Sequence, residues 1–364
     1  MASTLGERPG ETVGFRTRTD SAVSGRTRIE VVTEGLLVRR LLVDPTLDGV
    51  GAILFDEVHE RSLDLDAALG FCLDLQRELR PDLRILAMSA TPDGRAFTNL
   101  MNSALIESEG RQYPIDIRHT RDVMHPRDLP EACARAIRQA FTEEEGDILA
   151  FLPGVGEIRR TQALLGDAVP VFLLHGEQTT EDQDRAIAPS DRRRVVLATS
   201  IAETSVTVSG VRIVVDGGLR RAPRLDSNTG LSRLETLKIS RATATQRAGR
   251  AGRQSPGVAI RLWSEATQRS LRPQDAPEIL VADLTDFALV TAAWQDVMGT
   301  APDMLPLLDA PPAGVLAGGR ELLRELGALN EAGQITALGK RIVGLGTHPR
   351  LAAMLCAAKT IPAR

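Results

Sequence analysis

The clearest hydrophobic pattern along the chain is a short apolar run at residues 53–55 that stops at two adjacent carboxylates, Asp56 and Glu57. A brief, continuous apolar run is typical of a parallel strand that is buried on both faces. Apolar residues then recur at helical spacing over residues 63–79, and a second strand-like run occupies residues 83–88. This order predicts a strand, a helix and a strand, with the two carboxylates at the carboxyl end of the first strand.

The alternation of strands and helices extends to both sides of this region. Residues 12–20 alternate as a strand does, and residues 28–35 predict a strand that enters a helix. Farther along, a helix is predicted near residues 130–142, and strands are predicted at 147–152, 170–174, 194–198 and 211–216. Strands that alternate with helices indicate a doubly wound sheet, so we expect an α/β fold.

The last quarter of the chain has a different character. It begins with turns rich in Pro, Asp and Leu and continues with helices at 322–329 and 338–345 around an extended segment at 333–336. Residues 104–130 are polar and contain prolines, which suits a bridge between domains. We therefore expect three domains, which cover residues 1–108, 109–271 and 272–364.

Composition places few limits on function. A chain of 364 residues with 43% hydrophobic and 25% charged residues is an ordinary globular protein of two or three domains. A net charge of −4 means that any nucleic-acid partner would bind a local basic patch. The cysteines, Cys72, Cys133 and Cys356, lie far apart in apolar surroundings and are interpreted as core residues. The chain has no signal peptide and no long apolar run, so we expect a cytoplasmic location.

The acidic pair is the first candidate for chemistry. In an open α/β sheet, nucleotides bind beyond the carboxyl ends of the strands, which is where the pair is predicted to lie. Asp56 would hold Mg²⁺, directly or through water, and Glu57 would orient or deprotonate the attacking water. The simpler alternative is a strand that ends in a solvated acidic turn.

The neighbouring motifs decide between these alternatives. Asp56-Glu57-Val58-His59 resembles the DEAH form of the Walker B box of superfamily 2 helicases. Further stretches follow in the order of that family, and they resemble motif III (Ser89-Ala90-Thr91), motif IV (149–154), motif V (198–205) and motif VI (246–253). Residues 33–35 resemble motif Ib of the same family. The chain thus resembles the DEAH-box RNA helicases, most closely a bacterial branch of them, over nearly its whole length.

The resemblance implies two RecA-like parallel-sheet domains in tandem, the first of them incomplete, and then a small, mostly α winged-helix domain with the start of the ratchet helices. It implies ATP and Mg²⁺ as cofactors. The implied catalytic residues are Asp56, Glu57, His59, Gln246, Arg250 and Arg253. The same resemblance adds Ser89 and Thr91 to the nucleotide contacts, and it makes Asp56 and Glu57 the metal ligands.

Motif VI is the most specific of these elements. Arg250 and Arg253 are three residues apart, so on a helix they would share one face and reach the γ-phosphate of a nucleotide held by the other domain. Gly249 and Gly252 are costly in a helix unless another part of the chain approaches closely, which argues against a generic basic helix. Arg247 is expected to form structural ion pairs.

The resemblance also implies RNA contacts. Thr33 and Gly35 at a helix mouth would hold a phosphate, although a simple helix cap would use the same residues. The hydroxyls of Thr199 and Thr204 would contact the RNA backbone. Ser209 stands where the family usually carries an acid. Residues 220–241 hold six basic residues against two acids and predict a hairpin that faces RNA through Arg221 and Arg224, or else a solvated charged hairpin.

One family motif has no counterpart in the sequence. A P-loop needs Gly-x4-Gly-Lys-[Ser/Thr], and none of the three lysines stands in that frame; Lys340 follows a glycine pair with the wrong spacing. We therefore expect a shortened chain that also ends inside the helical domain. The leading hypothesis is an ATP-dependent RNA helicase that moves 3′ to 5′. The alternatives are a non-hydrolysing nucleic-acid-binding remnant and a DNA-directed helicase.

Overall fold

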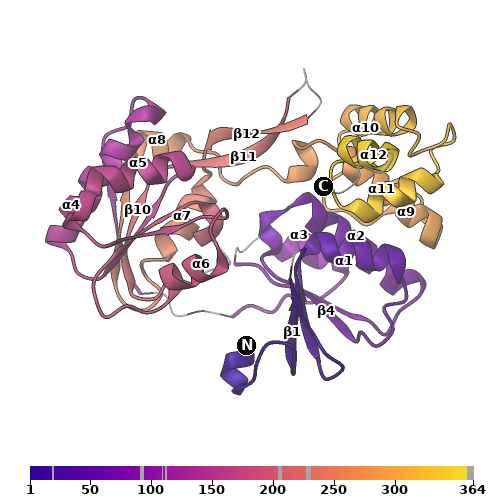
Figure 1. Ribbon diagram of the computed structural model, residues 1–364, viewed down its shortest axis with the longest axis horizontal. Coiled ribbons are helices and arrows are strands. Elements are labelled where there is room, and N and C mark those ends of the chain that lie inside the picture. Colours follow the sequence, from indigo (N-terminus) through magenta and orange to yellow (C-terminus); the bar gives the residue numbers. More distant parts are fainter. Residues whose placement is uncertain are drawn as a thin grey trace. The chain divides into compact units, whose positions relative to one another are not determined.

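The protein folds as two compact units (Figure 1). A computed structural model describes residues 1–18, 20–90, 94–108, 110, 113–203, 207–226 and 231–358. The first unit comprises residues 1–106, 225–232 and 277–364, and the second comprises residues 107–224 and 233–276.

A six-stranded parallel sheet forms the centre of the second unit. Its strand order is β6 (Ile115–His119), β13 (Gly257–Arg261), β10 (Val211–Asp216), β7 (Asp147–Phe151), β9 (Val195–Ala198) and β8 (Val171–Leu174). Alternate residues of β7, β9 and β10 belong to two different apolar cores, one on each face of the sheet. This burial on both faces explains why these strands were visible in the sequence as uninterrupted apolar runs.

Helices cover both faces of this sheet. Helices α4 (Leu129–Glu143) and α5 (Val155–Leu165) contribute to one core. Helices α6 (Thr180–Ile187) and α7 (Arg241–Gly249) contribute to the other. Helix α8 (Glu265–Ser270) follows β13, and the paired strands β11 (Leu219–Asp226) and β12 (Leu231–Lys238) extend from the sheet as a hairpin (Figure 1).

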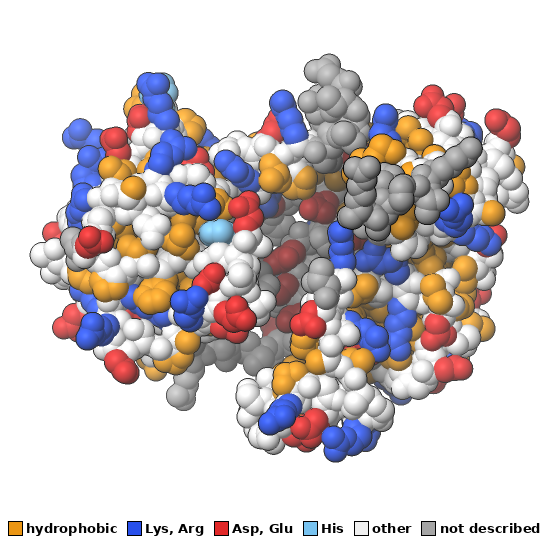
Figure 2. All heavy atoms as spheres, viewed as in Figure 1, with side chains coloured by type: hydrophobic (Ala, Val, Ile, Leu, Met, Phe, Trp, Pro, Cys, Tyr) orange, Lys and Arg blue, Asp and Glu red, His pale blue; other side chains and the backbone are white. Residues whose placement is uncertain are grey.

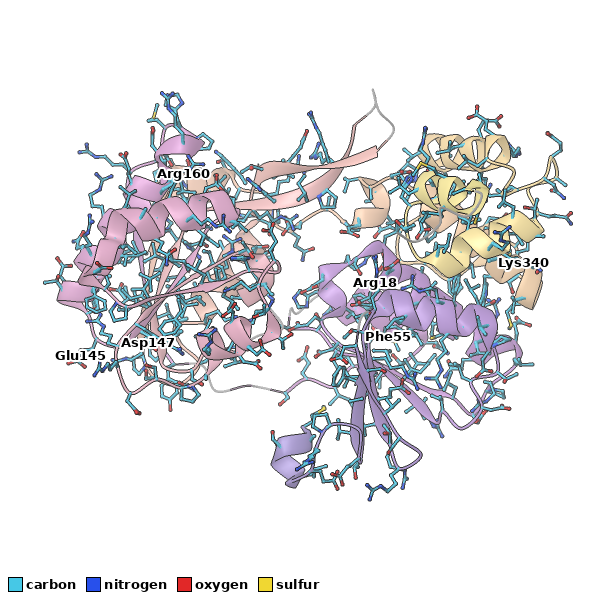
Figure 3. The ribbon with its side chains drawn as sticks, in the orientation of Figure 1. Arg18, Phe55, Glu145, Asp147, Arg160 and Lys340 are labelled. Carbon is cyan, nitrogen blue, oxygen red and sulfur yellow. The ribbon has the colours of Figure 1, made fainter. Side chains whose placement is uncertain are left out.

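The first unit contains two smaller groups of strands. Strand β1 (Val13–Arg16) pairs antiparallel with β2 (Ser21–Ala22) and parallel with β3 (Ile29–Val32), and β4 (Ala52–Phe55) pairs parallel with β5 (Arg84–Ala87). The helices that follow are α1 (Glu34–Val43), α2 (Leu63–Glu78) and α3 (Gly94–Met101). Ile53 and Phe55 belong to the core that the helices line (Phe55 is labelled in Figure 3), whereas Leu54 is 59% exposed. Among the described residues, this β4–β5 pair is therefore covered on one face.

Four helices complete the first unit. They are α9 (Thr285–Met298), α10 (Ala313–Glu325), α11 (Ala337–Leu345) and α12 (Pro349–Ala357), and a single antiparallel bridge joins Leu329 to Ile335. Helix α9 belongs to two cores. Trp294 stacks on Phe71 of α2 with ring centroids 4.5 Å apart, while Leu289 packs with the later helices.

The α/β fold and the small helical C-terminal region agree with the sequence analysis, as do the predicted strands of the second unit. Three predictions were wrong. Residues 272–321 were predicted to form turns but contain α9; α10 ends at Glu325 and does not continue to residue 329; and the bridge at 104–130 contains β6. Helix α9 has apolar partners on several sides, so it lacks the one-sided pattern of a surface helix. Strand β6 lies at the edge of the sheet and carries Asp116 and Arg118, which hide its strand pattern.

Candidate functional site

The acidic pair lies at the carboxyl end of β4, as predicted. Glu57 adopts a left-handed backbone conformation with φ of 51°, and its N–H donates to Asp56 Oδ1 at 2.9 Å. The next amide, that of Val58, donates to the Met88 carbonyl at 3.0 Å and opens a 3₁₀ turn at Val58–Glu60. A left-handed non-glycine residue costs on the order of 1 kcal/mol, and such residues cluster at functional sites. The bend at Glu57 is therefore evidence against an ordinary solvated turn.

His59 connects the acidic pair to the end of the neighbouring strand. Its Nδ1 lies 3.4 Å from the Ala90 amide, 3.5 Å from Ser89 Oγ and 3.5 Å from Glu57 Oε2. The structure thus brings Glu57, His59 and Ser89 together. Thr91 lies outside the described residues, so its predicted nucleotide contact stays a prediction.

Thr33 and Gly35 lie at the N-terminus of α1. Thr33 is the N-cap residue, yet its side chain accepts no hydrogen bond from the described helix, so the simple cap does not account for its hydroxyl. Gly35 has a structural reason to be glycine. A Cβ at this position would lie 2.7 Å from Asp64 Oδ2, so α1 and α2 approach each other closely here.

A groove beside these residues was not predicted from the sequence. It has a volume of about 930 Å³, runs between β1–β3 and α1, and is lined by Arg16, Arg18, Arg39 and Arg40 together with Asp20, Glu30 and apolar residues. The position of Arg18, one of the arginines of this groove, is labelled in Figure 3. Glu30 pairs with Arg16 at 2.5 Å and with Arg40 at 3.2 Å. Four arginines against two acids leave the lining positive. The arginines come from two separate stretches, so no charge run in the sequence marked the groove.

In the second unit, the predicted motif V follows β9. Thr199 is joined to the adjacent strand by its amide, which donates to the Leu174 carbonyl at 3.1 Å, and it opens a short 3₁₀ turn at Ser200–Ala202. Thr204 lies outside the described residues, and its predicted RNA contact stays a prediction. Glu203 is described, and it accepts hydrogen bonds from two motif VI arginines, Arg247 and Arg250.

The predicted geometry of motif VI needs correction. Helix α7 ends at Gly249, so Arg250 is its C-cap and Arg253 lies in the following turn; the two arginines do not share a helix face. The Arg250 guanidinium is buried and donates to the Glu203 carbonyl, and Arg253 donates to Thr207 Oγ1 at 2.5 Å. Both arginines therefore contact residues in or next to the predicted motif V, which the sequence analysis did not predict.

The two glycines of motif VI differ. A Cβ at Gly252 would lie 2.8 Å from the Tyr113 carbonyl oxygen, which is the expected close approach. A Cβ at Gly249 would meet no atom of the described residues within 4 Å, so for this glycine the expectation was wrong. Its low helix propensity instead fits the end of α7.

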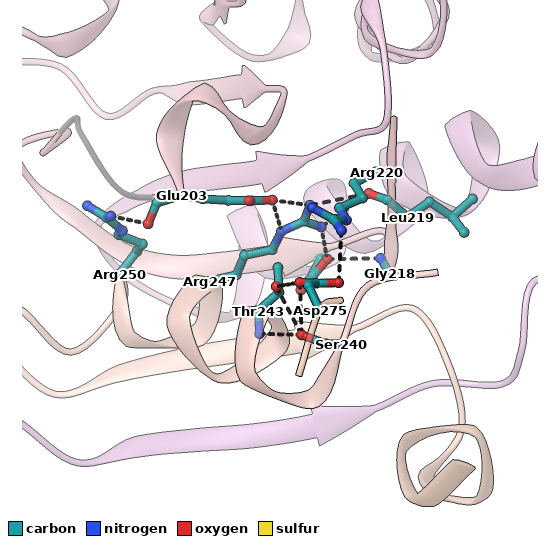
Figure 4. A network of polar contacts seen from close by, with 10 residues as sticks. Glu203, Gly218, Leu219, Arg220, Ser240, Thr243, Arg247, Arg250 and Asp275 are labelled. Atoms are coloured by element: carbon teal, nitrogen blue, oxygen red, sulfur yellow. Dashed lines mark hydrogen bonds and ion pairs between the residues drawn. The ribbon is translucent and has the colours of Figure 1, made fainter. Parts of the chain in front are cut away.

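Arg247 lies at the centre of a buried polar network (Figure 4). Its side chain is 1% exposed and donates to Asp216 Oδ1 at 2.7 Å and to Glu203 Oε1 at 2.8 Å. The guanidinium also lies 4.8 Å from the centroid of the Phe151 ring. Burial raises the pKa of Glu203 above its ordinary value, and the positive charge of Arg247 opposes that rise. The structural role expected of Arg247 is confirmed.

The predicted basic hairpin is less positive than its sequence indicates. Arg221 lies 3.7 Å from Glu157, and Arg224 lies 4.0 Å from Glu235. Asp275, from outside the hairpin, pairs with Arg220 at 2.9 Å. Adding Glu157 and Asp275 to the two acids of residues 220–241 lowers the local surplus of positive charges from four to two. On the face in Figure 2, Lys and Arg side chains are interspersed with acidic and apolar ones.

The described residues place limits on other kinds of site. They contain no group of three or more His, Cys, Asp or Glu side chains that could hold a metal ion. No helix in the described ranges is both long enough and apolar enough to cross a bilayer. Cys72 and Cys133 are buried, and burial raises the pKa of the Cys133 thiol to about 12.

Comparisons with known proteins agree with the resemblance found in the motifs. The helicase conserved C-terminal domain family matches residues 130–255, and the helicase associated domain (HA2), winged-helix, matches residues 320–346. The chain is 44% identical to the ATP-dependent RNA helicase HrpB of Escherichia coli over 99% of its length, and 36% identical to the probable ATP-dependent RNA helicase DHR2 of Saccharomyces cerevisiae over 99%.

The fold agrees as well. The crystal structure of Escherichia coli DEAH/RHA helicase HrpB superposes with a TM-score of 0.90 over 99% of this chain and 46% of that one. The chain spans 45% of the HrpB sequence and 51% of the DHR2 sequence, about half of each.

Proposed function

Since the chain belongs to the DEAH-box helicase family, we propose that it supplies RNA-binding and nucleotide-hydrolysing residues of an ATP-dependent RNA helicase that moves 3′ to 5′. The relatives are named as RNA helicases, and about half of their length corresponds to this chain. The observation that carries the proposal is the acidic pair at the carboxyl end of β4, where Glu57 is held in a left-handed conformation.

The acidic pair fits a magnesium nucleotide. Mg²⁺ usually keeps several waters and takes one or two carboxylates plus phosphate oxygens, and Asp56 with Glu57 offers that ligand set in place of an all-protein cage. When bound, the metal would neutralise charge that develops on the transferred phosphoryl group. Asp56 would hold it, and Glu57 would orient the attacking water. His59 and Ser89 would fix the position of Glu57 relative to the end of β5.

The arginines would complete the site. In the proposal, Arg250 and Arg253 reach the γ-phosphate, and Gln246 helps to place the water. Guanidinium forks bind phosphate oxygens in pairs, and such groups contribute about 10³ to 10⁵ in rate in related nucleotidases. Arg253 would bind phosphate through the N–H groups that its bond with Thr207 does not use, which would link nucleotide binding to the motif V region.

RNA would bind through hydroxyls, amides and arginines that carry no sequence information. We assign this role to Thr33 and Gly35 at the N-terminus of α1 and to the arginines of the adjacent groove. In the second unit, Thr199, Thr204 and the hairpin residues Arg221 and Arg224 would contact the RNA backbone. Since Arg221 and Arg224 lie near acids, their phosphate contacts would compete with existing ion pairs.

The test is a comparison of the chain with its Glu57→Gln variant. Nucleotide hydrolysis is measured with and without single-stranded RNA, and RNA binding is measured separately. We expect RNA-stimulated hydrolysis that the substitution abolishes and RNA binding that it preserves. Equal hydrolysis by both proteins would remove Glu57 from its assigned role.

The rival function is a non-hydrolysing nucleic-acid-binding protein. It is favoured by one observation, that no Gly-x4-Gly-Lys-[Ser/Thr] frame occurs in the 364 residues. RNA binding without any hydrolysis would support the rival. Competition between RNA and DNA oligomers at fixed salt tests a third possibility, a DNA-directed helicase, which would prefer the DNA oligomer. A cytoplasmic location stays a prediction.

A further inference from the structure

The β11–β12 hairpin is connected to α7, the helix of motif VI, by the chain itself and also by side-chain contacts. Strand β12 ends at Lys238, and only Ile239 and Ser240 separate it from α7. Ser240 is the N-cap of α7, and its hydroxyl accepts from the Thr243 amide at 3.1 Å. Any displacement of β12 along its own direction is therefore applied directly to the first turn of α7.

Asp275 connects β11, the first strand of the hairpin, to the first turn of α7. Its Oδ1 pairs with Arg220 of β11 at 2.9 Å. Its Oδ2 accepts from the hydroxyls of Ser240 at 3.0 Å and Thr243 at 2.6 Å (Figure 4). A single carboxylate thus contacts the base of β11 and the N-terminus of α7, where a negative charge also matches the helix dipole.

The segment that carries Asp275 also caps α7 through its backbone. The amides of Arg241 and Ala242 donate to the carbonyls of Arg272 and Pro273 at 2.8 and 3.0 Å. These bonds satisfy amides that a helix end otherwise leaves without an intrahelical partner. The first turn of α7 is therefore fixed on one side by this segment and on the other by the hairpin.

The opposite end of α7 carries the predicted phosphate-binding arginines. Nine residues at 1.5 Å each make a rod about 13 Å long, with Arg250 directly at its end. Within the rod, Arg247 donates to the Leu219 carbonyl, at the start of β11, at 3.3 Å. The hairpin base thus contacts α7 at its first turn through Asp275 and near its last turn through Arg247.

We propose that Asp275 is a positioning residue that couples the β11–β12 hairpin to α7, so that RNA held by the hairpin changes the order and position of Arg250 and Arg253. This inference rests on the proposed function, because it needs RNA at the hairpin. It adds a residue outside the recognised motifs and assigns it a coupling role. In this role Asp275 acts through the helix, which it contacts at Ser240 and Thr243.

Hydrogen exchange of the complete 364-residue chain, with and without saturating single-stranded RNA, tests the coupling. In the unchanged protein, RNA should slow amide exchange both in the hairpin and in residues 244–253, by about fivefold or more. In Asp275→Asn, the hairpin should still be slowed, while residues 244–253 should be slowed less than in the unchanged protein, because only the link through β12 and the Arg247–Leu219 contact remain. Asn keeps the shape and one acceptor, so the fold is retained, which thermal unfolding verifies.

Arg220→Gln is the second variant. It removes the ion pair between Asp275 and β11 and leaves the Ser240 cap of α7 intact. It should likewise weaken the response of residues 244–253 at saturating RNA. Glu265→Gln is the matched control: it removes an exposed carboxylate on α8 that lies 3.7 Å from Arg269 and has no bond to α7, and it should behave as the unchanged protein does.

The outcomes separate the inference from the proposed function. If RNA slows residues 244–253 equally in Asp275→Asn and in the unchanged protein, Asp275 is not the coupling residue. If RNA binds but slows exchange only outside the hairpin, the coupling is refuted and the RNA-binding function stands. If no RNA binds to the unchanged chain, the proposed function fails and the coupling with it.

Discussion

Replacing Arg247 by Met removes the guanidinium that donates hydrogen bonds to two carboxylates of the second unit, Asp216 and Glu203. The side chains of Arg247 and Asp216 are 1% and 3% exposed, and that of Glu203 is 13% exposed. Removing one partner of such a buried pair costs about 3 to 5 kcal/mol, because it leaves charges buried without compensation. We therefore expect Arg247→Met to lower the free energy of unfolding of the second unit by that amount.

The loss of unfolding free energy should depend on pH, and the direction of this dependence follows from the pKa of Glu203. Burial already raises the pKa of Glu203 in the folded protein, and removal of Arg247 raises it further. A carboxyl with a folded pKa above its unfolded value favours folding at low pH and loses that contribution as pH rises through the folded pKa. The deficit of the variant should thus be larger near about pH 8 than near about pH 5.

Urea unfolding followed by tryptophan fluorescence measures this effect. The chain has two tryptophans, and a Trp294→Phe background leaves Trp263, in the second unit, as the only reporter. Arg269→Met is the control, since its ion pair with Glu265 is exposed and should be worth less than about 1 kcal/mol. A loss below about 1 kcal/mol for Arg247→Met, or a loss that shrinks as pH rises, would refute the reasoning.

Three further predictions concern particular side chains. Trp294→Phe keeps the stacked ring but removes the N–H that donates to buried Asp74 at 2.8 Å, so urea unfolding should show a loss of about 2 to 4 kcal/mol in the first unit. Gly252→Ala places a Cβ 2.8 Å from a backbone carbonyl oxygen and should cost about 1 to 3 kcal/mol in thermal unfolding, whereas Gly249→Ala should be neutral or stabilising. Glu57→Gly should be more stable than Glu57→Gln by about 1 kcal/mol, because glycine adopts the left-handed backbone without strain. Both variants should lose hydrolysis. Equal melting temperatures of the two variants would show that the backbone at Glu57 is not strained.

The parts of the fold that the sequence predicted correctly are those where one local pattern decides the structure. The strands of the second unit are buried on both faces, so their apolar runs needed no tertiary information. The position of Asp56 and Glu57 was also predicted correctly from the end of an apolar run, but the expected burial of that strand on both faces was wrong, since Leu54 of β4 is 59% exposed.

The missed parts depend on contacts between distant residues. Helix α9 is apolar on several sides because it packs both on α2 and on the later helices, which no local window of sequence reveals. The spacing of Arg250 and Arg253 suggested one helix face, but where α7 ends is decided by glycine and by bonds to Glu203 and Thr207. Asp275 lies more than thirty residues from its partners Ser240 and Thr243, and nothing in its neighbourhood marks it.

The proposed function requires that Asp56 and Arg253 both contribute to the binding of one magnesium nucleotide. The most direct measurement is a double-mutant cycle on the affinity of the chain for magnesium nucleotide, with Asp56→Asn, Arg253→Gln and the combination, by calorimetric titration. Groups that act on one ligand as a unit are strongly non-additive, so we predict that the second substitution costs far less once the first is made. Additive losses, or no nucleotide binding by the unchanged chain, would contradict the account.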